Sequence, residues 1–141
     1  MVRIAPVLVA DDAALSALNR LLPQLSTTAT PLTIDDLADI IATDTALLLA
    51  HVDDVAVGTL SLIFYRTPSG VRARIEDVVV DEATRGHGVG RELTRAAIDL
   101  ARSRGARSVD LTSRPSRVAA NELYRSEGFE LRDSASYRFA F

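Results

Sequence analysis

The sequence predicts an α/β fold with a mixed, mostly antiparallel sheet and helices on both of its faces. Three apolar segments follow one another through short turns between residues 46 and 80, which indicates strands joined as hairpins. A segment with helical spacing then separates the last of them from another short strand, and a crossover of this kind joins parallel strands. The expected order of elements is β-α-α-β-β-β-α-β-α-β.

The N-terminal elements have recognisable boundaries. Residues 2–9 are apolar and rich in β-branched side chains, which predicts the first strand. An aspartate pair at 11–12 precedes apolar residues at helical spacing and is therefore expected to cap a helix, which Pro23 ends. Thr33 is the expected cap of a second, shorter helix.

The middle of the chain is expected to form three strands, over residues 46–52, 55–65 and 72–80. Asp53-Asp54 separates the first two strands and Pro68-Ser69-Gly70 the last two, and both are turn sequences. Such short connections join antiparallel neighbours, so this part of the sheet is expected to be antiparallel.

The second half of the chain changes to helical spacing after Gly90. Apolar residues fall on one helical face until Gly105, a residue type that commonly follows the end of a helix. A short strand is expected over 109–112, and Ser116 is a candidate cap for a helix over 118–127.

The last residues, 137–141, alternate large apolar side chains with smaller or charged ones and predict a final strand. The same apolar tail is the candidate contact surface if the protein forms a homodimer. This is a hypothesis about the oligomeric state, since the sequence does not determine it.

Composition limits the class of protein. A length of 141 residues fits one domain spanning 1–141, and 48% apolar residues are enough for a core. The net charge of −3 argues against a nucleic-acid partner, and no apolar run approaches the ~18 residues of a membrane span. The N-terminus lacks a signal-peptide pattern, so a cytoplasmic location is expected. With two distant histidines and no cysteine, no metal site is expected.

The clearest chemical signal is a glycine-rich loop between a strand and a helix, which reads Arg85-Gly86-His87-Gly88-Val89-Gly90-Arg91. Free amides at a helix start, together with the helix dipole, favour an anion. Glycine allows a ligand to approach the backbone closely, and the two arginines add positive charge that suits phosphate. The alternative is a turn that only connects the strand to the helix.

Two other phosphate-binding loops fit this segment less well. A dinucleotide fold uses G-x-G-x-x-G near its first strand, whereas the spacing here is G-x-G-x-G and some 80 residues precede it. A P-loop requires G-x-x-x-x-G-K-[ST], and the chain has no such string.

At this point the sequence resembles the GNAT acyltransferase superfamily. The core motif of that family is Gln/Arg-x-x-Gly-x-Gly/Ala, which residues 85–90 match. A second family feature is a helix reading Asn-x-x-Ala-x-x-Leu-Tyr-x-x-x-Gly-Phe. Residues 117–129 read Arg-Val-Ala-Ala-Asn-Glu-Leu-Tyr-Arg-Ser-Glu-Gly-Phe, with the alanine, leucine, tyrosine and Gly-Phe in register. Together with the expected element order, the resemblance covers essentially the whole chain.

The resemblance implies a co-substrate, acetyl-CoA, and an amine acceptor. In the family, backbone groups of the central strand bind the pantetheine arm, which corresponds to Val78, Val79 and Val80. The pyrophosphate then lies on the amides from Gly86 to Arg91. Tyr124 corresponds to the family tyrosine that donates a proton to the departing sulfur, a role that a phenol with a pKa near 10 can fill at neutral pH.

The chain departs from the family helix at one position. The family asparagine seven residues before the tyrosine is Arg117 here, and an arginine cannot accept a hydrogen bond. Arg117 either contacts a CoA phosphate, meets an acidic substrate, or is merely exposed. Asn121, three residues before the tyrosine, is a candidate contact to CoA, with a plain surface or capping role as the alternative.

An amine must lose a proton before it attacks a thioester, so a general base is required. Glu76 and Asp77, on the strand that should line the cleft, are the candidates. Regular alternation places Glu76 on the face of Val78 and Val80 and favours it, whereas a bulge, which the family often has in this strand, would change the assignment. An ion pair between Glu76 and a neighbouring arginine is the structural alternative.

The sequence therefore predicts an N-acetyltransferase that works by direct attack of a primary amine on acetyl-CoA. The acceptor is either a small molecule or a protein, and the sequence does not distinguish the two. A different class remains as the alternative, an acyl-CoA-binding sensor without catalysis.

Overall fold

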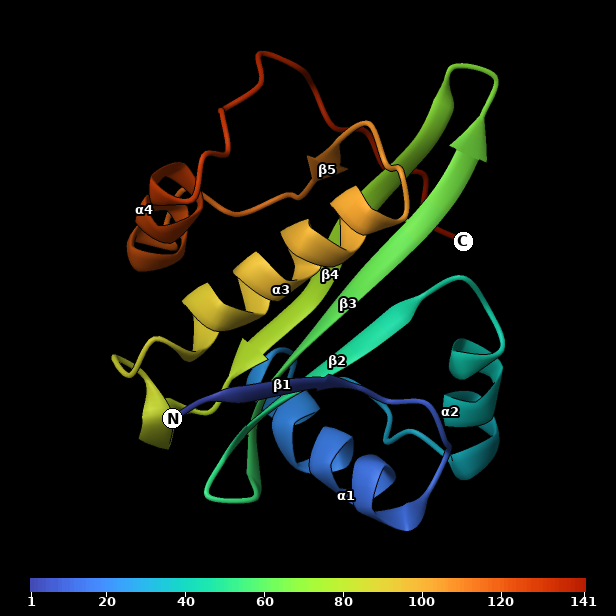
Figure 1. Ribbon diagram of the computed structural model, residues 1–141, viewed down its shortest axis with the longest axis vertical. Coiled ribbons are helices and arrows are strands. Elements are labelled where there is room, and N and C mark those ends of the chain that lie inside the picture. The colour runs from blue at the N-terminus through green and yellow to red at the C-terminus, as the bar shows by residue number, and fades with distance from the viewer.

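The computed structural model describes all of residues 1–141 and contains one five-stranded sheet (Figure 1). The strands lie in the order β1-β2-β3-β4-β5, and every neighbouring pair is antiparallel except β4 and β5, which are parallel. The predicted mixed sheet is thus confirmed. The strands are β1 (Arg3–Pro6), β2 (Ala46–Val52), β3 (Val55–Thr67), β4 (Gly70–Val80) and β5 (Val109–Asp110).

The helices begin and end largely where the sequence predicts. Asp11 caps the first helix by accepting a hydrogen bond from the Ala14 amide at 2.9 Å. Thr33 and Asp36 form a reciprocal capping box at the start of the second. No helix combines the length and the apolar composition that crossing a bilayer requires. The helices are α1 (Asp12–Leu21), η1 (Leu22–Gln24), α2 (Ile34–Ile41), η2 (Glu82–Thr84), α3 (Val89–Ser103) and α4 (Val118–Ser126).

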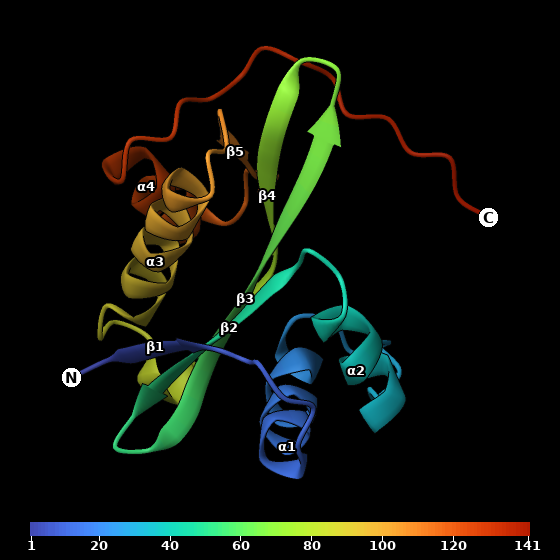
Figure 2. The same ribbon diagram turned by 45° about the vertical axis from the view of Figure 1, so that its right-hand side comes forward.

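Helices cover both faces of the sheet, with α3 and α4 on one side and α1 and α2 on the other (Figure 2). Under α3, the fully buried Leu93 belongs to a cluster that includes Leu60 and Leu62 of β3. On the opposite face, Leu37 of α2 belongs to a second cluster with Leu47 of β2. Apolar burial on both faces fixes the middle of the sheet, so the strands at that level form a rigid support for the loops that follow them.

Strand β4 contains a bulge close to its C-terminal end. Ser61 of β3 pairs with Glu76 and Thr59 pairs with Val79, so a single residue of β3 faces two residues of β4. Asp77 lies in this bulge with a φ of 51°. The extra residue reverses the alternation of side chains beyond it. The expectation that Glu76 shares a face with Val78 and Val80 is therefore wrong for Val80. Glu76 pairs with Ser61 and Val80 pairs with Gly58, and these two positions of β3 are an odd number of residues apart, so they face opposite sides of the sheet.

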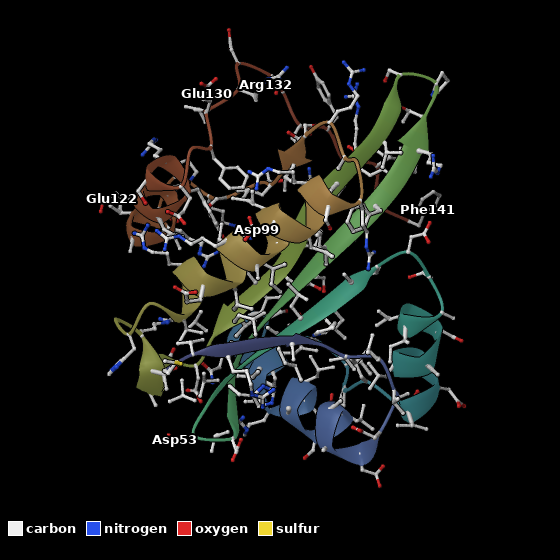
Figure 3. All side chains as sticks on the ribbon, viewed as in Figure 1. Asp53, Asp99, Glu122, Glu130, Arg132 and Phe141 are labelled. Atoms are coloured by element: carbon white, nitrogen blue, oxygen red, sulfur yellow. The ribbon has the colours of Figure 1, made fainter.

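Two expectations about the last third of the chain are wrong. Ser116 does not cap α4, because the residue at the cap position is Arg117 and no side chain bonds the helix start. Residues 137–141 form no strand, and Tyr137 is 93% exposed. This segment runs past the tip of the β3–β4 hairpin, ending at Phe141 well away from β5 (Figures 2 and 3). Alternating apolar residues form a strand only when a partner strand pairs with them, and none does here.

Candidate active site

The loop between β4 and α3 is shaped by two glycines. Gly86 has a φ of 86° and Gly88 a φ of 80°, and an added Cβ at either residue would meet no atom within 4 Å. Space is therefore not the constraint. The constraint is the left-handed backbone, which costs a residue with a side chain about 1–2 kcal/mol. The path of the loop depends on glycine at both positions.

The backbone amides from Gly86 to Arg91 form a continuous row of unused donors. None of them donates a hydrogen bond within the chain, and the first helical bond at this end runs from Glu92 to the Gly88 carbonyl at 3.0 Å. Amides at the start of a helix carry partial positive charge and bind phosphate or carboxylate groups. Unused donors of this kind at the start of α3 are what an anion-binding site requires.

Gly90, the third glycine of the loop, lies close to two neighbouring side chains. A Cβ on Gly90 would lie 3.3 Å from Cδ2 of Leu123 on α4 and 3.7 Å from Cγ2 of Val80 on β4. The first turn of α3 thus packs tightly against both neighbours. This close packing places α4 and the end of β4 beside the row of amides.

The polar side chains of the loop differ in what they contact. Arg85 and His87 are exposed, and neither makes a hydrogen bond or an ion pair within the chain. Arg91 instead donates from Nη1 to Oε2 of Glu127 at 2.7 Å and to the hydroxyl of Ser126 at 3.0 Å. Its guanidinium is engaged with α4, so the two arginines predicted to face phosphate are not equivalent. Only the Arg85 guanidinium is free for an anion, whereas Arg91 offers its amide.

Next to the loop, one edge of β4 has no partner strand. β5 pairs with β4 only at Ala73 and Arg74, and beyond that point the two strands part. On its other edge β4 pairs with β3 as far as Val80. Backbone groups of Val78–Val80 on the β5 side are therefore available to an extended ligand. Asp81–Arg85, which include η2, connect this edge to the row of loop amides, and Gly90 of the loop packs beside Val80.

The two candidate bases are held differently. Glu76 accepts a hydrogen bond from Nε of Arg74 at 2.7 Å, and Arg74 also donates to the hydroxyl of Thr112 after β5. The ion pair considered as the alternative role of Glu76 is thus present. Asp77 makes no ion pair, and burial, followed by the nearby charge of Glu76, raises the pKa of its carboxyl. A raised pKa makes a carboxylate a stronger base.

Tyr124 lies on the inner side of α4 and is only 7% exposed. Its ring meets that of Phe129 edge-on, with 5.8 Å between the centroids. Burial raises the pKa of the phenol, and the positive charge of Arg117 partly opposes that rise. Tyr124 lines a hollow of about 890 Å³ together with Thr112, Asn121 and other residues of β4, β5 and the C-terminal segment. At neutral pH the phenol keeps its proton.

Asn121 ties α4 to the loop before it. Its side-chain amide donates to the carbonyl of Arg114 at 2.9 Å and to that of Arg117 at 2.8 Å. These bonds occupy both donors of its side-chain amide, and the residue also lines the hollow beside Tyr124. Arg117 is exposed at the start of the same helix.

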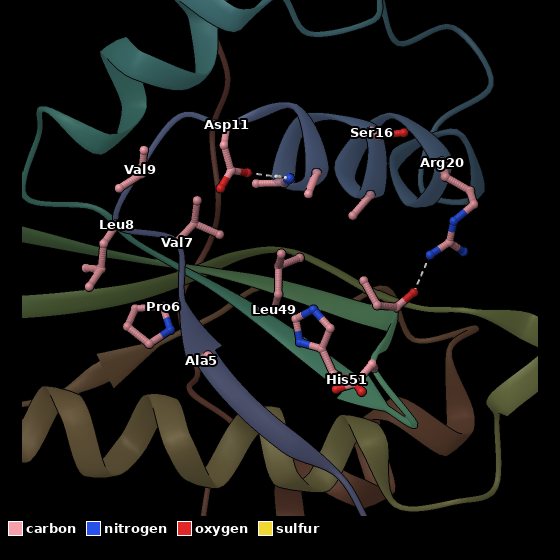
Figure 4. Close-up of a pocket in the computed structure, with 15 residues that line it drawn as sticks. Ala5, Pro6, Val7, Leu8, Val9, Asp11, Ser16, Arg20, Leu49 and His51 are labelled. Carbon is pink, nitrogen blue, oxygen red and sulfur yellow. Dashed lines mark hydrogen bonds between the residues drawn. The ribbon is translucent and has the colours of Figure 1, made fainter.

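A second hollow, of about 610 Å³, lies between β1, the end of β2 and α1 (Figure 4). None of the predicted site residues lines it. The His51 ring lies there between the sheet and α1, and burial lowers its pKa. No group of three or more histidine, aspartate or glutamate side chains is placed to hold a metal ion.

The sequence did not indicate the acidic residues that join α4 to α3 and the end of β4 to α1. Glu127 is held between two arginines of α3, and Asp81 is bound by Arg20 of α1. Both acids occur in segments that would ordinarily be exposed, and their partners are far away in the sequence. Nothing local in the sequence indicates either contact.

Comparison with known proteins connects this geometry to a family. The model of the acetyltransferase (GNAT) family matches residues 15–129, which include the glycine loop and α4. The chain is 33% identical over 86 residues to a mycothiol acetyltransferase of Beutenbergia cavernae, a match that covers 61% of this chain and 29% of that protein. The chain therefore spans less than a third of the length of this curated relative.

Solved structures agree over the full length. An acetyltransferase of Trypanosoma brucei matches with a TM-score of 0.82 and 26% identity, covering 100% of both chains. A transcriptional regulator of Bacillus halodurans C-125 matches equally well, again with a TM-score of 0.82, 26% identity and 100% coverage of both. Because the family model extends over most of its residues, the chain belongs to the GNAT acetyltransferase family.

Proposed function

We propose that this acyltransferase moves the acetyl group of acetyl-CoA to a primary amine of a small molecule or a protein, by direct attack of the amine. One observation carries the proposal. The free edge of β4 at Val78–Val80 lies beside the loop whose amides from Gly86 to Arg91 are unused. An extended molecule that ends in a diphosphate fits such an arrangement, and the family's use of acetyl-CoA agrees with it.

The loop supplies the anion site of this proposal. The amides from Gly86 to Arg91 hold the pyrophosphate, and the free guanidinium of Arg85 adds charge to it. Backbone groups of Val78, Val79 and Val80 hold the pantetheine arm. When bound, acetyl-CoA supplies a thioester, an acetyl group already activated for transfer. Oriented in this way, the thioester end lies toward the point where β4 and β5 part.

Three groups of the chain then serve the transfer. A backbone amide near Val80 stabilises the negative charge that develops on the acyl oxygen. Tyr124 holds a proton on its hydroxyl for the departing sulfur, and its raised pKa keeps that proton in place at neutral pH. Asp77 is the better candidate to accept the proton of the amine, since Glu76 is engaged with Arg74.

Thermal unfolding with saturating acetyl-CoA, CoA or NAD tests the co-substrate. A ligand at 100 times its dissociation constant adds about 2.7 kcal/mol, which raises the midpoint by several degrees. We expect a rise with acetyl-CoA and CoA and none with NAD. A panel of primary amines and of peptides with free N-termini or lysines, followed by thiol release, then tests the transfer. Absence of any rise with both CoA species would overturn the proposal.

A sensor that binds acyl-CoA without catalysis is the second candidate. One specific observation favours it, since a structural neighbour that matches over its full length is a transcriptional regulator. Thiol release with an amine acceptor separates the two functions. If the protein binds acetyl-CoA yet releases no thiol with any member of the panel, the sensor is the better description.

A further inference from the structure

Glu127 is an acidic residue whose side chain is largely covered by its neighbours. It follows the last residue of α4, and its side chain is only 7% exposed. Its Oε2 accepts from Nη1 of Arg91 at 2.7 Å, and its Oε1 accepts from Nε of Arg95 at 2.5 Å. These hydrogen bonds and charges lower the pKa of the carboxyl, with Arg95 as the largest cause. A buried carboxylate is tolerated only when it is paired in this manner.

The charged cluster of Glu127, Arg91 and Arg95 joins α4 to α3. These two helices serve different ends of the proposed ligand. Arg91 lies in the first turn of α3, where the unused amides are. Glu127 lies three residues after Tyr124, and the carbonyl of Tyr124 accepts hydrogen bonds from the amides of Glu127 at 3.2 Å and Phe129 at 3.0 Å. Any movement of Glu127 relative to α3 is therefore transmitted to the tyrosine.

Apolar packing also lies beside the cluster, where Leu123 approaches Gly90 closely. This contact holds the two helices together, and the charged cluster adds bonds of fixed direction to it. Directional, charge-assisted bonds fix one relative position, whereas a smooth apolar contact permits several.

We propose that Glu127 is a positioning residue that fixes Tyr124 relative to the phosphate-binding turn of α3. The inference rests on the proposed function of both sites. It also gives Arg91 a role different from phosphate binding, because its guanidinium holds α4. With the pyrophosphate on the turn, the cluster keeps the tyrosine hydroxyl at the distance that the sulfur end of CoA requires.

The composition of the chain offers a direct measurement. It contains three tyrosines and no tryptophan. In a Tyr65→Phe, Tyr137→Phe background, Tyr124 is the sole source of tyrosine fluorescence, and acrylamide quenching reports its exposure at neutral pH. We expect Glu127→Gln to raise the quenching constant at least twofold. Asp99→Asn, which breaks an exposed ion pair on the outer face of α3 (Figure 3), should leave the constant unchanged.

Calorimetric titration with CoA and a double-mutant cycle complete the test. Glu127→Gln should change the dissociation constant of CoA less than threefold but lower kcat at least tenfold, measured with an amine accepted in the panel. Because Glu127 acts through Tyr124, the same substitution in a Tyr124→Phe background should lower kcat less than twofold further. A residue that only stabilises the fold would lower kcat by the same factor in both backgrounds.

The outcomes separate this inference from the proposed function. Unchanged quenching in Glu127→Gln, or equal losses in both backgrounds, overturns the positioning role and leaves acetyl transfer standing. Failure of the wild type to bind CoA overturns the proposed function itself. Should Glu127→Gln not fold, Arg95→Gln removes one partner of the carboxylate while Arg91 remains. It should then raise the quenching constant in the same direction by a smaller factor, and no rise would again overturn the inference.

Discussion

Asp81, the residue directly after β4, accepts a hydrogen bond from the guanidinium of Arg20 on α1, with 3.2 Å between Nη1 and Oδ2. The same side chain accepts a bond from the Ala83 amide at 3.1 Å. Gln24 accepts a bond from the Glu82 amide, also at 3.1 Å. The first helix and the turn after it thus hold the segment that leads into the glycine loop, from the opposite side of the sheet.

We expect Asp81→Asn to lower stability in a pH-dependent manner. The backbone bond from Ala83, followed by contacts with Gln24 and Arg20, lowers the pKa of Asp81 below its ordinary value of 3.8. A carboxyl with a lowered folded pKa contributes stability above its unfolded pKa and loses it as the pH falls through the folded value. In urea denaturation the variant should unfold earlier than the wild type at pH 7, and the difference should shrink below pH 3.8.

Asp99→Asn serves as the control for this comparison, since Asp99 forms an ion pair in which both side chains are about three-quarters exposed. Exposed pairs contribute about 0–1 kcal/mol, so little change is expected at any pH. A difference between Asp81→Asn and the wild type that stays constant down to pH 3 would show that the Asp81 charge is not involved.

Gly88→Ala should damage the ligand site more than the fold. The left-handed backbone at Gly88 costs alanine about 1–2 kcal/mol, and any relaxation of that strain reorients the amides that follow. We therefore expect a loss of CoA affinity of about tenfold, equivalent to about 1.4 kcal/mol, in calorimetric titration. Gly88→Asp, which also brings a negative charge to the anion site, should abolish binding.

Gly105→Ala is a matched control at the other end of α3. Gly105 has a φ of 78°, against 80° at Gly88, and an added Cβ would likewise meet nothing within 4 Å. Both alanine variants should lower the thermal midpoint similarly, but only the Gly88 variant should lose affinity for CoA. Equal affinity losses in the two variants would mean that the effect comes from general destabilisation.

Arg85→Ala should weaken CoA binding through charge alone. The Arg85 side chain is exposed and makes no hydrogen bond or ion pair within the chain, so we expect its removal to leave the fold unchanged. A charge-assisted hydrogen bond to phosphate contributes about 1.5–3 kcal/mol, which predicts at least a tenfold rise in the dissociation constant at low salt. The effect should diminish as salt is added, because exposed charges are screened. An unchanged affinity would remove Arg85 from the site.

Much of the fold could be predicted from local sequence signals. The capping pair of Thr33 and Asp36, and the glycines at both ends of α3, act over a few residues and are visible in the sequence. The glycine loop was also located correctly, because the backbone conformation at Gly88 depends on that residue itself. Signals of this kind need no information about distant partners.

The features that the sequence did not determine depend on distant partners. The bulge at Asp77, which the sequence offered only as an alternative, arises from how β4 pairs with β3, and it places Glu76 on the face opposite Val80. Burial of Glu127 depends on two arginines more than thirty residues earlier. A strand at 137–141 requires the edge of a neighbouring strand to pair with. The alternation of side chains does not indicate whether such an edge is present.

Asp77→Asn should lower activity and raise stability together. Burial and the charge of Glu76 raise the pKa of Asp77, so the folded protein disfavours its ionised form. A carboxyl with a raised folded pKa destabilises the fold as the pH rises through that range and remains unfavourable at pH 7. Asparagine removes the charge, keeps the shape and tolerates the φ of 51° at this bulge. The urea midpoint at pH 7 should therefore increase.

Activity should move in the opposite direction if Asp77 is the base. Loss of a general base lowers turnover by about 10²–10⁴-fold. The fall of kcat/KM at acidic pH that comes from protonation of Asp77, with a midpoint above pH 3.8, should also vanish. Glu76→Gln is the matched comparison, because it removes the neighbouring carboxylate that is paired with Arg74. If Asp77→Asn lost stability along with activity, the carboxylate would be supporting the bulge instead. If both results are obtained, the charged Asp77 destabilises the fold and is nevertheless needed for the reaction, so its role is chemical.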